Sequence, residues 1–174
     1  MLGIAYADND VAARSRHIDA ASSLEKNSDE LQSCNPGGGL PLRLPGPSID
    51  GQEIVYRVDI FDPCWIYPAV DLDAIHHVEV AAAERPYNFQ LWKDIDKVVT
   101  RPSAHGDTEL QIHLDTCSGA TVAAIPLSGA VDKNGFARLT TALKSAGSKH
   151  DLCFVFARAT ANPLWMIDTV RLQP

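Results

Sequence analysis

Three histidines and one aspartate are spaced like metal ligands on a β-scaffold. His76 and His77 are adjacent, and His113 precedes Asp115 by two residues. Imidazole and carboxylate groups of this kind bind zinc or other transition metals. Successive side chains of a strand point to opposite faces, so His76 and His77 cannot easily bind one ion. We therefore expect surface histidines and no metal site, and a small metal-dependent jelly-roll enzyme stays the third and weakest functional hypothesis.

Other catalytic arrangements are not evident. We recognise no Ser-His-Asp set, glycine-rich phosphate loop or reactive cysteine context, and we assign no catalytic residue and no cofactor. Asp168 is unusual because it interrupts the apolar run from Trp165 to Leu172. A buried, unpaired carboxylate is costly, so we expect Asp168 to cap a loop or to pair with Arg171 or another cation.

Four cysteines, Cys34, Cys64, Cys117 and Cys153, are too far apart in sequence for a CxxC metal knuckle. They can form two disulfides if the parent protein is exported, or remain small buried apolar residues in a reducing compartment. Four cysteines allow three disulfide pairings, and the sequence does not choose among them.

Size and charge limit the class of protein. The 174 residues suit one domain with an appendage, and 45% hydrophobic residues can fill a core. A (β/α)8 barrel needs roughly 250 residues, so this chain is too short to form one. The net charge of −7 argues against binding to nucleic acid.

No apolar run approaches the roughly 20 residues that span a bilayer, so we expect no membrane partner. The N-terminus lacks a signal-peptide pattern and looks like the tail of a preceding segment. The location of the chain is left unknown, with a periplasmic or secreted parent protein as one option.

The N-terminal region, residues 1–33, is expected to be a helical segment or linker. Residues 8–33 contain no proline or glycine, and Val11 with Ile18 and Leu24 with Leu31 recur at heptad spacing. This apolar stripe is too thin to stabilise an isolated helix, so the segment needs a surface to lie on.

From residue 38 onward the hydrophobic pattern has period two. Short β-rich runs are bounded by Gly, Ser or Pro, and no amphipathic helix separates them. The pattern predicts an all-β, antiparallel β-sandwich over residues 34–174. The runs are 53–58, 77–80, 109–114, 121–127 and 151–156.

An insert at 84–107 departs from this pattern. Two strand-like pieces, 88–92 and 97–101, flank the sequence "KDID", which suits either an extra hairpin or a long loop. Aromatic residues are enriched at protein contacts, and the insert either contacts a partner or is a solvated hairpin whose aromatics cover the sandwich edge. The expected contact residues are Tyr87, Trp92, Lys93 and Asp94.

Four pieces of sequence, in order, resemble the family 6 carbohydrate-binding modules. They are "DPCWIYPAVDLDAIHHVEVAAA", "DTELQIHLDTCSG", "TVAAIPLSGAVDKNGFARLTT" and "HDLCFVFARATANPLWMIDTVRL". The likeness covers roughly residues 55–174 apart from the insert. It implies a jelly-roll, galactose-binding-like sandwich, and it places His113 where the family carries an exposed Arg.

Residues 30–174 also resemble the C-terminal accessory region of bacterial family 20 β-N-acetylhexosaminidases. "VDIFDPCWIYP", "RPYNFQLWKDIDKVVTRP" and the four cysteines carry this likeness. It implies a non-catalytic module, since hydrolysis in that family belongs to a separate barrel. The expected function is glycan recognition, for N-acetylglucosamine-containing glycans, or support of a hydrolase catalytic domain. The alternative is an interaction or stabilising module that has lost sugar binding and contacts the hydrolase or a second copy of itself.

The family 6 resemblance also implies where a sugar would bind. Phe136 matches the family's loop aromatic, Met166 replaces its cleft Asn, and near Asp59 no second aromatic stands. The resemblance therefore leaves a damaged cleft, and its remaining candidate carbohydrate-binding residues are Phe136, Trp165, Asn162 and Asp62. Phe136 and Trp165 are alternatively core residues.

Asp168 matches an acid that helps hold a structural Ca²⁺ in the family. The usual partner Glu is missing from "LPLRLPGP", so calcium is left open.

Overall fold

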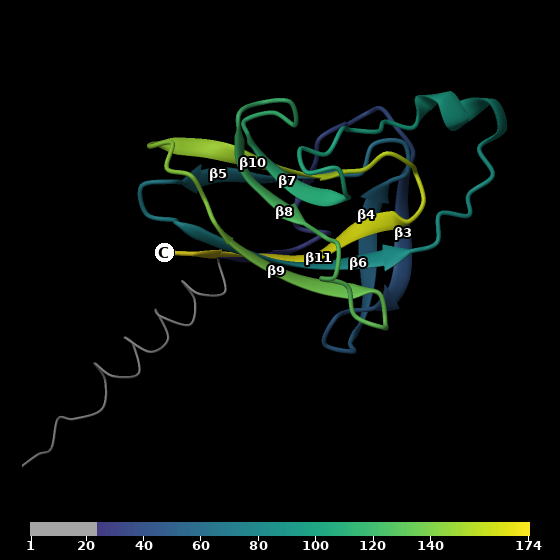
Figure 1. Cartoon of the computed structure of the whole chain (residues 1–174), viewed down its shortest axis with the longest axis horizontal. Coiled ribbons are helices and arrows are strands. Elements are labelled where there is room, and N and C mark those ends of the chain that lie inside the picture. Colours follow the sequence, from purple (N-terminus) through teal and green to yellow (C-terminus); the bar gives the residue numbers. More distant parts are fainter. Residues whose placement is uncertain (1–23) are drawn as a thin grey trace, which may run out of the picture.

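Eleven strands and one short helix form from the alternating pattern in residues 24–174, the part of the chain that the computed structural model describes (Figure 1). The strands are β1 Glu25–Asn27, β2 Gln32–Ser33, β3 Pro41–Pro47, β4 Glu53–Asp59, β5 Cys64–Asp71, β6 His77–Arg85, β7 Glu109–Leu114, β8 Thr121–Pro126, β9 Phe136–Ala142, β10 Lys149–Ala157 and β11 Leu164–Gln173. The helix is the 3₁₀ segment η1, Trp92–Lys97. Within this part of the chain, no helix is long and apolar enough to cross a membrane.

The strands pair antiparallel in two main sheets. One sheet has the order β1-β11-β6-β9 and the other the order β2-β5-β10-β7-β8, while β3 and β4 form a separate hairpin. Figure 1 shows β10, β5, β7 and β8 in one layer and β11, β6 and β9 in the other. The predicted antiparallel β-sandwich is confirmed.

Aromatic side chains join the two layers. Phe156 of β10 stacks on Trp165 of β11, with ring centroids 5.4 Å apart, and meets Trp65 of β5 edge to face at 5.9 Å. All three rings are buried. Aromatic pairs of this kind add to the stabilisation from burial, so they fix β11 against the opposite sheet.

The helix expected for 8–33 is wrong over residues 24–33, and residues 8–23 lie outside the described part of the chain. Residues 25–27 pair with β11, and Asn27 starts a turn in which its Oδ1 accepts from the backbone N–H groups of Asp29 and Glu30. Leu31 is then 1% exposed in the core. The Leu24–Leu31 spacing thus spans a turn between two strands, and the sandwich begins at residue 25 rather than 34.

The insert is a long loop, and the hairpin alternative is wrong. Between β6 and β7 the backbone forms only η1 and one isolated bridge, from Arg101 to Arg158. Figure 1 shows η1 at the outer end of this connection, away from the two sheets.

The cysteines form two disulfides, Cys34–Cys64 and Cys117–Cys153. The sulfurs of Cys34, Cys64 and Cys117 lie within 4.8 Å of one another, so the two bridges are neighbours. They pack with Val155 and Ile66 in a small cluster of their own. Cys34–Cys64 ties the N-terminal segment to β5, and Cys117–Cys153 ties the β7–β8 turn to β10.

Replacing Cys117 and Cys153 together by Ala should lower the free energy of unfolding by about 3–4 kcal/mol, because the bridge closes a long loop in the unfolded chain. The bridge spans a sequence separation of 36 residues. Urea unfolding with and without reductant measures this. Equal stability of the variant and the oxidised wild type would contradict the pairing.

Candidate functional site

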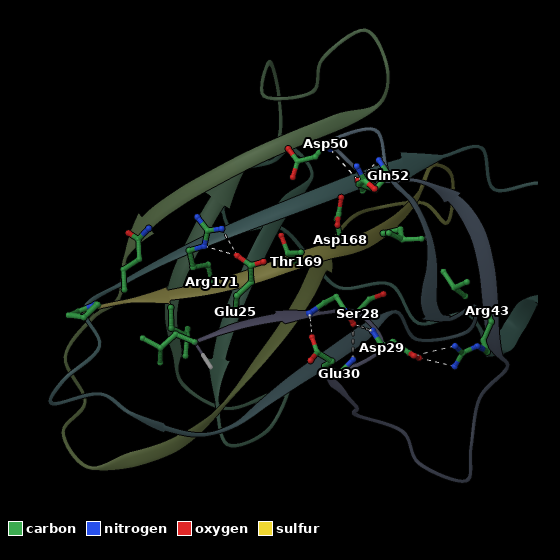
Figure 2. Close-up of a pocket in the computed structure, with 18 residues that line it drawn as sticks. Glu25, Ser28, Asp29, Glu30, Arg43, Asp50, Gln52, Asp168, Thr169 and Arg171 are labelled. Carbon is green, nitrogen blue, oxygen red and sulfur yellow. Dashed lines mark hydrogen bonds and ion pairs between the residues drawn. The ribbon is translucent and has the colours of Figure 1, made fainter. Parts of the chain in front are cut away.

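A groove with a volume of about 1100 Å³ lies between β1, β11 and the β3–β4 turn (Figure 2). We call it the Asp168 groove. The side chains used below are Leu24, Glu25, Asp29, Glu30, Arg43, Ser48, Asp50, Gln52, Ile54, Asp168 and Arg171.

A β-bulge places Asp168 in this groove. In the β11–β6 pair, Ile167 opposes Ala82 and Thr169 opposes Ala81, so Asp168 is an extra residue on β11. Val170 and Leu172 then return to the core, while Arg171 stays half-exposed. Bulges re-aim side chains and are frequent beside functional sites.

Asp168 is only 3% exposed, yet no cationic side chain of residues 24–174 pairs with it. Its Oδ2 accepts the backbone N–H of Ile49 at 2.7 Å. Burial raises the pKa of the Asp168 carboxyl; the Ile49 hydrogen bond and Arg138 oppose this effect, while Asp50 and Glu25 add to it. The predicted loop cap is present, and the predicted pair with Arg171 is wrong because Arg171 pairs with Glu25.

The walls of the groove carry more negative than positive charge. Arg171 binds Glu25, and Arg43 makes a two-pronged pair with Asp29, with Nη1–Oδ1 at 2.8 Å. Both guanidinium groups in the lining are therefore already paired (Figure 2). Such a surface offers many acceptors and a few fixed donors to a polar ligand.

A calcium site at Asp168 gains little from the surrounding acids. Among residues 24–174, the only three His, Cys, Asp or Glu side chains close enough to share an ion are Cys34, Cys64 and Cys117. These cysteines are in disulfides. Ca²⁺ takes six to eight oxygen ligands, so at Asp168 it would depend on main-chain oxygens and water.

The two candidate sugar-stacking aromatics are core residues. Phe136 is 7% exposed at the start of β9 and lies under the guanidinium of Arg85, 5.5 Å from the ring centroid. Trp165 is 3% exposed and stacks on Phe156. Neither ring has an open face for a sugar, so their assignment to a binding platform is corrected.

Asn162 and Asp62 do lie at one end of the sandwich, but both side chains are already hydrogen-bonded to the insert. Asn162 Oδ1 accepts the backbone N–H of Tyr87 at 2.9 Å. Asp62 forms a two-pronged pair with Arg101, with Nη2–Oδ2 at 3.1 Å. Asp59, where the resemblance expects an aromatic, instead accepts the backbone N–H groups of Phe61 and Asp62 in its own loop and of Leu40 before β3.

The expected partner-contact residues separate into two groups. Tyr87 is half-buried: its hydroxyl donates to Ile60 O at 3.1 Å, and its ring meets Phe89 at 5.3 Å. Trp92 is 81% exposed and Lys93 is exposed, while Asp94 pairs with Lys97 at 3.0 Å. Tyr87 anchors the insert, and Trp92 is left free to contact another molecule.

The histidine predictions are half right. His76 and His77 are exposed, but His113 is only 7% exposed. Its Nε2 lies 3.1 Å from Gln111 Oε1, and Gln111 Nε2 donates to Glu109 at 2.6 Å. The expected exposed position is wrong because the β7–β8 turn folds over His113, where Gly119 O lies 2.9 Å from its Nδ1.

A Ser-His-Asp chain that the sequence did not reveal lies where β10 begins, beside the end of β7. Asp115 accepts from His150 Nδ1 at 3.0 Å, and His150 Nε2 is 3.4 Å from Ser148 Oγ. However, the backbone N–H of Ser148 donates to Asp73 Oδ2 at 3.1 Å, so a carboxylate already lies at this residue. Ser148 is exposed at the surface. A nearby carboxylate opposes the negative charge that acyl transfer develops, so we assign no catalysis to this chain of residues.

No protein-family model matches the sequence, and a search of curated proteins finds no significant relative. Solved structures do match. A family 6 carbohydrate-binding module from Clostridium cellulolyticum, in complex with xylose, has a TM-score of 0.52 at 14% identity, over 86% of this chain and 96% of that one. The chain has the family 6 module fold.

Two further modules agree with this fold. A β-1,3-glucan-binding family 6 module from Bacillus halodurans gives a TM-score of 0.53 at 10% identity, over 86% of this chain and 95% of that one. A module from Cellvibrio mixtus lichenase 5A, in complex with cellotriose, gives 0.52 at 7% identity with the same coverages. The likeness to family 6 modules, inferred from the sequence, is confirmed for the fold.

Replacing Asp168 by Asn should raise the free energy of unfolding at pH 7 by on the order of 1 kcal/mol. Because the folded state raises the pKa of this carboxyl, wild-type stability falls as the pH rises through the carboxyl range. The advantage of the variant should vanish below about pH 4, where the side chain is neutral in both states. Urea unfolding between pH 3 and 8 measures this, with the exposed Asp107→Asn as the matched control. A variant less stable than wild type at pH 7 would show that the charge itself holds the fold.

Proposed function

We propose that this chain is a non-catalytic, carbohydrate-binding-like module that recognises a glycan in the Asp168 groove. One observation carries the proposal: a carboxylate that is 3% exposed and has no ion pair with residues 24–174 faces an open groove. Retaining such a group costs stability, and acids with perturbed pKa values concentrate at functional sites.

The chemistry of the groove suits a polyhydroxylated ligand. Asp168, Glu30 and Gln52 offer acceptors and an amide donor, and Leu24 and Ile54 offer small apolar patches for the C–H face of a ring. Sugar sites combine a few fixed polar groups with apolar contact. The family 6 fold supports the proposal because its solved members include modules in complex with xylose and cellotriose.

The accessory role follows from the sequence resemblance. A C-terminal region of a family 20 β-N-acetylhexosaminidase would hold N-acetylglucosamine-containing glycans near a separate catalytic barrel. We propose this context for the chain, with N-acetylglucosamine oligomers as the first ligands to test.

A second candidate function, contact with a protein partner, is favoured by Trp92. Its side chain is 81% exposed, and Ile95 and Val99 of the same loop are also exposed. The backbone φ of Trp92 is +46°, a left-handed conformation that is costly for a bulky residue. The partner would be the hydrolase catalytic domain or a second copy of the chain.

Glycan recognition predicts measurable binding of N-acetylglucosamine tri- or tetramers in calorimetric titration. Asp168→Ala should weaken this binding at least about tenfold, since a lost hydrogen bond to a charged group costs about 1.5–3 kcal/mol, and Gln52→Ala should weaken it about two- to tenfold, since a neutral hydrogen bond is worth about 0.5–1.5 kcal/mol. Trp92→Ala, outside the groove, should leave it unchanged. Binding that survives both groove variants would move the site elsewhere, and no binding of any oligomer would remove the function.

The partner contact predicts that Trp92→Ala lowers the apparent mass in sedimentation, or weakens binding to the catalytic domain at least about tenfold, as hot-spot aromatics do. Val55→Ala, an exposed apolar residue outside the loop, is the matched control. A wild type that is monomeric and has no affinity for the catalytic domain would end this second candidate.

A further inference from the structure

The charges in the Asp168 groove select among glycans. Its lining holds five carboxylates, Glu25, Asp29, Glu30, Asp50 and Asp168, but two guanidinium groups, Arg43 and Arg171, and no lysine or histidine. Arg171 and Arg43 already pair with Glu25 and Asp29. Asp50 lies 3.4 Å from Arg138, so Glu30 and Asp168 are the acids of this lining without a cationic partner among residues 24–174, and they repel an anionic sugar and attract a cationic one.

Asp168 is the acid for which a ligand cation would matter most. Within residues 24–174 its Oδ2 has the Ile49 N–H as a partner, while no hydrogen bond reaches Oδ1. Figure 2 shows the side chain between the β3–β4 turn and β11, in the lining of the groove. Coulomb attraction is strongest where water is excluded, so a cation at Oδ1 would relieve the cost of burying this charge.

The geometry favours a monovalent ammonium over a metal ion. A divalent cation needs several oxygens at once, and no third acid or histidine lies close enough around Asp168 among the described residues. An ammonium has three N–H donors, which one carboxylate and neighbouring acceptors can satisfy. Gln52 in the same lining offers its amide oxygen, whereas Ser48 Oγ already accepts the backbone N–H groups of Asp50 and Gln52.

We infer that the Asp168 groove recognises a hexose with a free primary amine, an amino sugar whose ammonium group binds Asp168 Oδ1. The inference rests on the proposed glycan recognition and names its ligand class: partly or fully de-N-acetylated glucosamine oligomers. The N-acetylated sugar keeps the ring contacts but lacks the positive charge.

The test compares glucosamine, N-acetylglucosamine and glucose tetramers of matched linkage by calorimetric titration at pH 6 and low salt. The glucosamine tetramer should bind at least about tenfold more tightly than the other two, the gain expected for a hydrogen bond between charged groups. The preference should shrink in high salt and at pH 9, where the amine loses its proton. Asp168→Asn should abolish the preference, and Asp107→Asn should keep it.

Each outcome separates this inference from the proposed function. Equal affinity for the amino and N-acetylated tetramers would overturn the inference and leave glycan recognition standing. No binding of any tetramer would overturn both. A lysine tetrapeptide that binds as tightly as the glucosamine tetramer, or a preference that survives in Asp168→Asn, would show charge attraction without sugar recognition and would also overturn the inference.

Discussion

The contact of Phe156 with Trp165 is the interaction on which the rest of the structure depends. It joins a strand of the five-stranded sheet to a strand of the four-stranded sheet, and both rings are almost fully buried. With Trp165 fixed in the core, β11 can bury Val170 and Leu172 on the same face only if one extra residue is inserted between Ile167 and Thr169. That residue is Asp168. The packing of the two sheets therefore creates the bulge, and the bulge places a carboxylate in the groove.

Two buried acids of this chain show how similar burial has different consequences. The Glu109 side chain is inaccessible, and burial alone would raise its pKa; hydrogen bonds from the Ala104 N–H, Gln111 and His105 outweigh burial and lower that pKa. Asp168 has one such hydrogen bond, and its pKa is raised. A satisfied carboxylate stabilises the fold that holds it. An unsatisfied carboxylate that lines a groove is a better candidate for ligand binding.

The insert explains why the candidate site is not where the family resemblance places it. Tyr87 bonds to Asn162 and to Ile60, and Arg101 bonds to Asp62. These contacts use the polar groups that remained at that end of the sandwich, while Phe136 and Trp165 serve the core. The same segment carries Trp92 outward at its far end. The insert thus covers the end of the sandwich that holds Asn162 and Asp62, and it exposes Trp92 as a new contact surface.

The sequence by itself determined the elements that depend on neighbouring residues. Alternation of apolar and polar side chains predicted β7 at its observed bounds and β4, β8 and β10 to within two residues, because a strand with one buried face imposes period two locally. The order of four sequence motifs along the chain also predicted the family 6 fold.

The tertiary structure decided the features that depend on contacts between residues far apart in the sequence. Leu31 is in a strand-flanking turn because residues 25–27 pair with β11. His113 is buried because the β7–β8 turn folds over it, and the cysteines pair between segments that only the folded sandwich brings together. The burial of Asp168 and the direction of its side chain depend on a register shift of β11 against β6. No local sequence pattern encodes this shift, because it arises from the fit between the two sheets.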